Sequence, residues 1–91
     1  MELTEEQLTF LKGLDFLKLG QAVNHEQWQT AAMTVQRMER TIKQTGLSDM
    51  ERNMMGLKQA IRCKNQMESK QILSQLVAKR VRLLNQVSDA T

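Results

Sequence analysis

The feature that most constrains the fold is a helical pattern between Asn24 and Leu47, where apolar residues recur at intervals of three and four. That interval gathers side chains on one side of an α-helix. The predicted inner side consists of Trp28, Ala31, Ala32, Val35, Met38 and Ile42. The opposite side carries Gln29, Met33, Gln36, Arg40 and Lys43. Asn24 with Gln27 predicts the helix start, and Gly46 followed by Leu47 predicts its end.

The remaining sequence predicts further helices. Thr4 and Gln7 have the spacing of a capping box, which predicts a short helix within residues 1–12. Gly13 then predicts a bend, followed by a second short helix that ends near residue 21. Two later pairs predict the starts of two more helices, Ser48 with Glu51 and Asn65 with Glu68.

The apolar stripes of these two helices differ in width. The first is narrow and consists of Leu47, Met50, Met54, Leu57 and Ile61. The last is wide and consists of Ile72, Leu73, Leu76, Val77, Leu83, Leu84 and Val87. A wide stripe predicts packing against more than one neighbour. It also leaves open a homodimer formed through the last helix.

The composition and the short links between helices indicate the architecture. The 91 residues include no Pro and no Tyr and only one Trp, which favours helix over sheet. Short links make successive helices antiparallel neighbours. We therefore expect one all-α domain over residues 1–91, an antiparallel up-down four-helix bundle with a short extra N-terminal helix and a frayed tail at residues 88–91.

The charges and the single cysteine indicate the class of protein. Thirteen Lys and Arg residues against ten Asp and Glu give a net charge of +3, a mildly basic surface. Cys63 has no second cysteine to pair with, which suits a reducing compartment. The acidic start and the lack of an apolar run of about 20 residues argue against a secretory signal or a membrane helix. We expect a cytoplasmic protein that does not insert into membranes.

Nothing in the sequence indicates an enzyme. One histidine and one cysteine cannot supply a tetrahedral zinc site, and there is no Gly-rich phosphate loop. His25 is expected in the first turn of a helix with no orienting partner, and Cys63 is expected as a half-buried thiol between helices. We therefore predict no catalytic residue, no metal site and no cofactor.

The helix and link lengths, the start at Trp28-Gln29, the Gly46-Leu47 stop, the segment LKQAIRC and the final ESKQILSQLVAKRVRLLNQV resemble the histidine-containing phosphotransfer (HPt) domains over about residues 14–87. The resemblance implies that the phosphoacceptor position is Gln36, with Glu39 at the family's lysine and Arg40 at its glycine. All three residues depart from the family pattern. The resemblance therefore implies the scaffold without the phosphotransfer chemistry.

A binding surface is predicted on the outward sides of two neighbouring helices. Met33 and Met55 both lie on polar sides, where exposed methionine offers an adaptable contact surface. If the two helices form a hairpin, one patch would contain Met33, Gln36, Arg40, Met55, Lys58 and Arg62. Apolar spots rimmed by cations suit an acidic protein partner. In HPt domains the equivalent face docks on the receiver domain of a response regulator, so the resemblance implies a receiver domain or a histidine kinase as the partner.

Several alternatives stay open. The chain is otherwise a small helical adaptor or chaperone that binds an amphipathic segment outside two-component signalling. Gln36 is otherwise an ordinary solvated helix residue. Arg80, inside the last stripe, either extends along the bundle edge or meets an acidic group. The cluster of Lys79, Arg80 and Arg82 is more typical of a solvated face than of a nucleic-acid site, so nucleic acid is not the expected partner.

Overall fold

The computed structural model describes the backbone of residues 3–89 and the side chains of residues 3–86. Over these residues the chain forms α1 (Glu5–Lys12), α2 (Asp15–Asn24), α3 (Trp28–Thr45), α4 (Ser48–Arg62) and α5 (Gln66–Asp89), and no strand. The predicted all-α class is therefore confirmed. Of the predicted frayed tail, residues 88 and 89 belong to α5, and residues 90–91 lie outside the described part.

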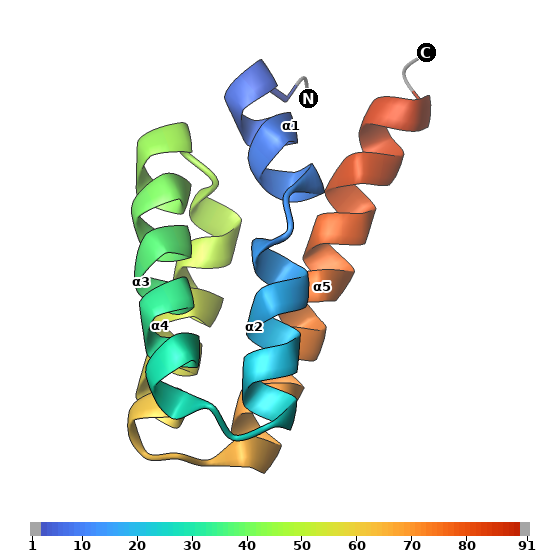
Figure 1. Ribbon diagram of the computed structural model, residues 1–91. Coiled ribbons are helices and arrows are strands. Elements are labelled where there is room, and N and C mark those ends of the chain that lie inside the picture. The colour runs from blue at the N-terminus through green and yellow to red at the C-terminus, as the bar shows by residue number, and fades with distance from the viewer. Residues whose placement is uncertain (1–2, 90–91) are drawn as a thin grey trace.

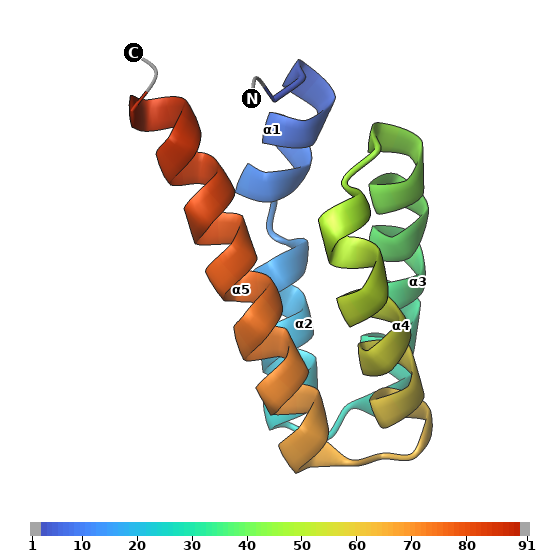
Figure 2. The same cartoon turned by 180° about the vertical axis from the view of Figure 1, so that it is seen from behind.

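Helices α2 to α5 lie side by side, with their links at the two ends of the molecule (Figure 1). Helix α3 packs against α2 and α4, and α5 packs against α4 and α2, so each of these four helices has two neighbours among the other three. Helix α1 sits beyond the start of α2 and touches α3 and α5. The same arrangement is seen from behind in Figure 2, where α5 crosses the full height of the molecule. Helix α5 thus has three neighbours, as its wide stripe predicts, but Val77 of that stripe is exposed and Val87 lies outside the described side chains.

The core fills the space between these helices. Its fully buried members come from all five helices and include Leu11, Leu19, Val35, Met38, Ile42, Met50, Met54, Leu57 and Leu76. The narrow stripe of α4 is buried over its whole length, as predicted. In α3 the prediction is wrong for Ala32, which is exposed, and Trp28 is only half-buried. Both residues lie at the margin of the stripe, where the surfaces of α3 and α4 diverge.

Two of the predicted helix starts are confirmed. The Thr4 hydroxyl accepts from the backbone N–H of Gln7 at 3.1 Å, and the Gln7 side chain accepts from the Thr4 N–H at 2.9 Å. Asn65 accepts from the N–H of Glu68 at 3.0 Å. These side chains satisfy amide groups that have no partner within the helix. The bend at Gly13 is also confirmed, since α1 ends at Lys12.

The other two predicted starts are wrong. Asn24 is the last residue of α2, and α3 begins at Trp28 without a side-chain cap. Ser48 lies inside the first turn of α4, and the capping position is Leu47. Helix α2 continues further than the sequence suggests, whereas α3 ends just before Gly46 as predicted and Leu47 takes the capping position expected of Ser48. In both places a tight turn brings the chain directly into the next helix.

These turns share one conformation. Glu26, Gly46 and Lys64 follow the ends of α2, α3 and α4 with positive φ angles of 54°, 77° and 54°. After each one, the next N–H bonds back to a carbonyl five residues earlier, at 2.8 Å for Gln27, 3.1 Å for Leu47 and 2.9 Å for Asn65. This is the hydrogen bond of a Schellman-type helix end. Only Gly46 is a residue that favours this conformation, which explains why the other two ends are not recognisable in the sequence.

Two polar side chains hold α1 in place. Gln7, although polar, is buried, and its Nε2 donates to the carbonyl oxygen of Thr45 at 2.6 Å. From the other side, Nε of Arg80 donates to the carbonyl oxygen of Leu11, and its guanidinium carbon lies 5.4 Å from the centre of the Phe16 ring. Arg80 therefore extends along the bundle edge and meets a helix-end carbonyl, not a buried glutamate.

Candidate functional site

Gln36 is exposed midway along α3, on the side of the helix that faces away from the core. It lines a hollow of about 430 Å³ between α3 and α4, together with Trp28, Ala32, Lys58 and Arg62. The small side chain of Ala32 leaves this space open. The resulting surface offers an uncharged amide beside two cations and the half-buried indole of Trp28.

A second hollow of about 360 Å³ lies further along the same two helices. It is lined by Glu39 and Lys43 from α3 and by Glu51, Met55, Lys58, Gln59 and Arg62 from α4. Because Lys58 and Arg62 line both hollows, the two form one continuous surface, which we call the α3–α4 groove. Met55 is 69% exposed and supplies its principal apolar contact area.

Glu39 connects the two helices across the groove. Its Oε1 lies 3.7 Å from Nζ of Lys43 in the next turn of α3 and 3.7 Å from Nζ of Lys58 on α4. The Glu39 side chain is 18% exposed, whereas the two lysines remain half or more exposed. One carboxylate is thus shared by two ammonium groups, so the groove keeps a positive charge. The spacing of Glu39 and Lys43 is visible in the sequence, but the contact with Lys58 is not.

The structure brings four of the six predicted binding residues into this groove: Gln36, Met55, Lys58 and Arg62. Arg40 is exposed on the outward crest of α3 and lines neither hollow. Met33 is 64% exposed but lines a separate hollow between α2 and α3, beside Arg37. The six residues therefore do not form one pocket, because Arg40 lies on the crest of α3 and Met33 lies on its α2 side.

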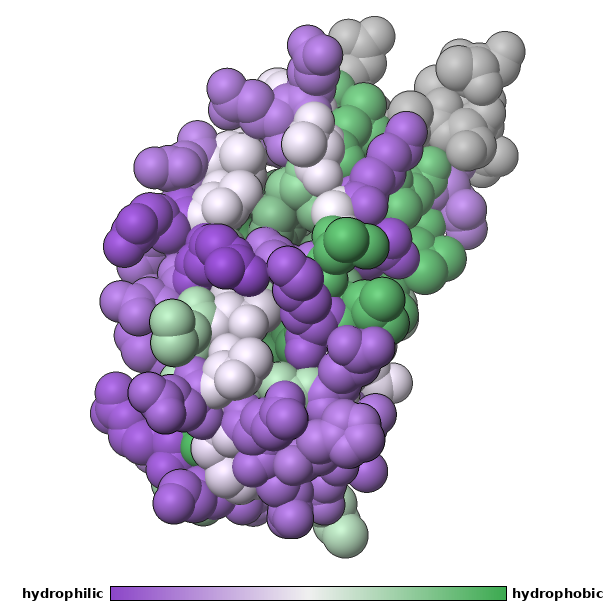
Figure 3. Space-filling model, viewed as in Figure 1, coloured by the Kyte–Doolittle hydropathy of each residue, from purple (hydrophilic) through white to green (hydrophobic). Residues whose placement is uncertain are grey.

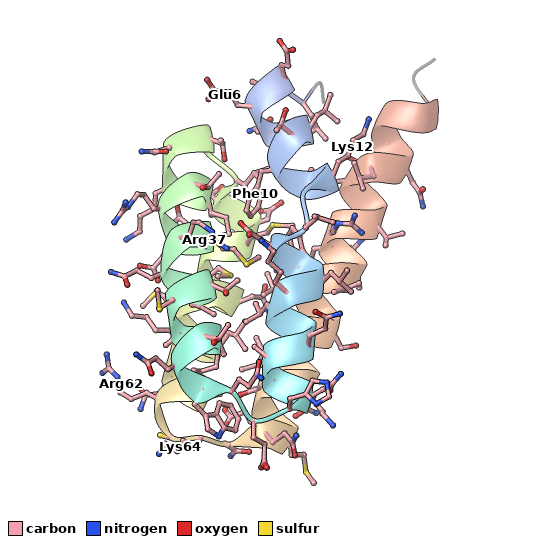
Figure 4. All side chains as sticks on the ribbon, viewed as in Figure 1. Glu6, Phe10, Lys12, Arg37, Arg62 and Lys64 are labelled. Atoms are coloured by element: carbon pink, nitrogen blue, oxygen red, sulfur yellow. The ribbon has the colours of Figure 1, made fainter. Side chains whose placement is uncertain are left out.

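Arg37 belongs to the α2 side of α3. Its Nη2 lies 2.7 Å from Oδ1 of Asp15, at the start of α2, and Figure 4 shows the side chain directed towards α2. The hydrogen bond from Arg37 to Asp15 and the charge of that carboxylate raise the pKa of the guanidinium above its ordinary value. This pair ties α2 to α3 and leaves Arg40 as the cation on the crest of α3.

The two side chains with catalytic potential, those of His25 and Cys63, are both placed differently from the prediction. His25 is not in the first turn of a helix but directly follows α2, and it is exposed. Cys63 follows α4 and is exposed instead of half-buried, with its sulfur 3.6 Å from the Gln59 amide nitrogen. Helix α2 ends at the residue before His25 and α4 ends at the residue before Cys63, so both residues lie in the turns that follow these helices. In the described part of the chain, no three His, Cys, Asp or Glu residues gather at a distance suited to a metal ion.

The basic residues of α5 do not form one cluster. Lys79 turns towards α4, where Nζ donates to the carbonyl oxygen of Asp49 at 2.7 Å and to Oδ1 of Asn53. Arg80 turns the other way, towards α1. Arg82 is exposed in a hollow beside Asp49. Lys79 and Arg82 therefore share one hollow beside Asp49, whereas Arg80 points to another side of the helix.

Within the described residues, the structure contains no helix whose length and hydropathy would allow it to cross a membrane. Comparison of the chain with models of known protein families, with curated proteins and with solved structures gave no match. The HPt resemblance consequently depends on the residues quoted for it above.

Proposed function

We propose that this chain is a non-catalytic protein-binding module, an antiparallel up-down four-helix bundle of the HPt type that docks through its α3–α4 groove on an acidic partner. A receiver domain of a response regulator is the partner that the HPt resemblance implies, with a histidine kinase as the other possibility. The observation that carries the proposal is Gln36, which is exposed midway along α3 and faces Lys58 and Arg62 across the groove.

The groove supports binding and disfavours phosphoryl transfer. An amide has no nucleophilic nitrogen comparable to an imidazole, so Gln36 offers no atom to carry a phosphoryl group. Glu39, three residues on, adds negative charge where a phosphoryl anion would need a cation. Binding, in contrast, is supported by the groove, where Met55, Lys58 and Arg62 give an apolar contact with a cationic border. This arrangement suits the acidic surface of a partner.

The experiment combines a labelling assay with a binding assay. Incubation with a phosphorylated receiver domain is expected to leave this chain unlabelled, while the immobilised chain retains the receiver domain. The double variant Lys58→Glu, Arg62→Glu should lose retention, whereas Lys12→Glu, outside the groove, should keep it. Labelling of His25, or retention that is unchanged in the double variant, would contradict the proposal.

A second candidate function is favoured by the exposure of Met33 and Met55, at 64% and 69%. Two exposed methionines on neighbouring helices suit a small adaptor or chaperone that binds an amphipathic segment without any two-component protein. The two candidates differ in their dependence on charge. An adaptor should lose its partner in the Met33→Ser, Met55→Ser variant and keep it at high salt, whereas receiver docking should weaken as salt increases.

A further inference from the structure

A second exposed surface lies on the opposite side of the bundle, where α2 packs against α5. Four large apolar side chains are exposed there: Leu14 at 66%, Leu17 at 59%, Val77 at 37% and Val81 at 45%. Figure 3 shows hydrophobic residues gathered over upper α2 and α5, whereas the side formed by α3 is mostly hydrophilic. These four exposed apolar side chains lie outside the α3–α4 groove.

Contacts between α2 and α5 place these four residues side by side. Gln66 contacts the carbonyl of Val23, a Cβ on Gly20 would lie 3.7 Å from Leu73, and Arg80 lies over Phe16. Along these contacts the residue numbers rise on α5 and fall on α2, so the two helices pack in opposite directions. This register sets Leu17 across from Val77 and Leu14 across from Val81. Leu14 and Leu17 thus form one row along α2, and Val77 and Val81 form a second row along α5, each at helical spacing.

Cations lie along these rows, whereas the nearest carboxylates, those of Glu5, Glu6 and Asp15, line a hollow beside Leu14 that extends towards α3. Lys12 comes two residues before Leu14, and Figure 4 shows it at the end of α1 beside α5. Lys70 lies seven residues before Val77, on the same side of α5. Arg80 lies at the seam between α2 and α5. Over the described side chains, every ion pair involves either Asp15 or Glu39 as the acid, and the bases are Arg37, Lys43 and Lys58. The cations at this surface are thus left without a carboxylate partner within the described chain.

We propose that this α2–α5 face, formed by Leu14, Leu17, Val77 and Val81 with Lys12, Lys70 and Arg80, binds an amphipathic helix of a partner protein that carries carboxylates along the borders of its apolar stripe. Two rows of apolar side chains at helical spacing fit the stripe of an incoming helix. The surrounding cations select acidic residues at its borders. The face is separate from the α3–α4 groove, so both surfaces can be occupied at once.

A second copy of this chain is the less suitable occupant. A two-fold contact through this face would bring the same cations of both copies together, because the carboxylates nearest to the face lie beside Leu14, in the hollow that extends towards α3. Like charges placed opposite each other in a contact are unfavourable and suppress that pairing. The charge pattern therefore favours an acidic partner over self-association.

The test uses two fluorescein-labelled helical peptides with the same leucine stripe, one bordered by glutamates and one by lysines. Fluorescence anisotropy with the full chain should show binding of the glutamate peptide at least tenfold tighter than the lysine peptide, weakening as salt is raised. The Leu17→Glu, Val81→Glu variant should lose at least tenfold in affinity. The Met67→Glu variant changes an exposed apolar side chain near the start of α5, outside both surfaces, and should bind as the unaltered protein does.

A charge variant covers the case in which the apolar substitutions disturb folding. Lys12→Glu, Lys70→Glu keeps the apolar rows and should reverse the preference, so that the lysine peptide binds more tightly. Equal binding of the two peptides, or affinity unchanged in both variants, would overturn the proposal. So would a dimer that Val81→Glu disrupts in sedimentation, or binding to phosphatidylserine vesicles but to neither peptide. Retained peptide binding in Lys58→Glu, Arg62→Glu would separate this face from the proposed receiver docking.

Discussion

The Glu39 carboxylate on α3 lies 3.7 Å from the Lys58 ammonium on α4, in a part of the α3–α4 groove where three cations and a second carboxylate, Glu51, also line the walls. The same oxygen lies 3.7 Å from Lys43, so Glu39 reduces the positive charge of the groove while linking its two walls. The HPt resemblance assigns this position to a lysine. The present residue therefore acts as an internal counter-ion in a surface that we propose is used for docking.

Replacing Glu39 by glutamine should separate its two roles. Because the lysines are half or more exposed, the lost ion pairs should lower the free energy of unfolding by less than about 1 kcal/mol. The groove gains one positive charge, so an acidic partner should bind more tightly, most clearly at low salt. Urea denaturation followed by circular dichroism, and titration calorimetry at two salt concentrations, measure both effects. Weaker binding by a stably folded Glu39→Gln protein would show that the carboxylate itself contacts the partner.

The helix ends give a stability prediction in both directions. Gly46 has a φ of 77°, so Gly46→Ala places a β-carbon in a left-handed conformation and should cost about 1 kcal/mol or more. Lys64 already has that conformation, with a φ of 54°. Lys64→Gly should therefore raise the free energy of unfolding by up to about 1 kcal/mol. Denaturant titrations of both variants test this, and a destabilising Lys64→Gly would mean that the lysine side chain stabilises the turn.

The turns that follow α2, α3 and α4 show which helix ends could be predicted from the sequence and which could not. Thr4 with Gln7, Asn65 with Glu68, and Gly46 are local signals, and the structure confirms each of them. The ends of α2 and α4 at Glu26 and Lys64 depend on tertiary packing that holds a strained backbone, and neither residue type signals it. The predicted cap at Asn24 failed for that reason, whereas the cap at Ser48 failed because the residue before it, Leu47, takes the capping position.

The candidate site was predictable to a similar degree. The exposure of Met33, Gln36 and Met55 follows from helical periodicity within each segment, and the structure agrees. Which exposed residues meet across two helices depends on the crossing and register of α3 and α4, which one segment does not encode. The link from Glu39 to Lys58, and the separation of Met33 from the groove, are consequences of that packing.

Arg80 should contribute to stability through α1. Its Nε donates to the Leu11 carbonyl and its guanidinium lies over Phe16, so Arg80→Ala removes a charged hydrogen bond and leaves that carbonyl without its partner. We expect a loss of about 1–3 kcal/mol in the free energy of unfolding. Hydrogen exchange should show α1 losing protection before α3 and α4 do. Arg82→Ala, two residues on and exposed, is the matched control, and an equal effect of the two substitutions would contradict this role.

Restoring the family pattern tests the resemblance itself. The triple variant Gln36→His, Glu39→Lys, Arg40→Gly supplies the imidazole, the cation and the small residue of an HPt domain at their expected positions. Incubated with a phosphorylated receiver domain, it should accept the phosphoryl group on the new imidazole, giving an acid-labile label. Gln36→His alone should be labelled far less, because Glu39 remains. A folded triple variant that stays unlabelled while it binds the receiver domain would argue against the assigned positions.

The most direct test of the proposed docking surface is a nuclear magnetic resonance titration. ¹⁵N-labelled protein is titrated with the receiver domains of the genome that encodes it, and amide shifts are mapped on the structure. The account predicts that at least one receiver domain shifts the exposed positions of the α3–α4 pair: Met33, Gln36, Arg40, Met55, Lys58 and Arg62. Shifts confined to the α2–α5 face, or no shift with any receiver domain, would contradict it.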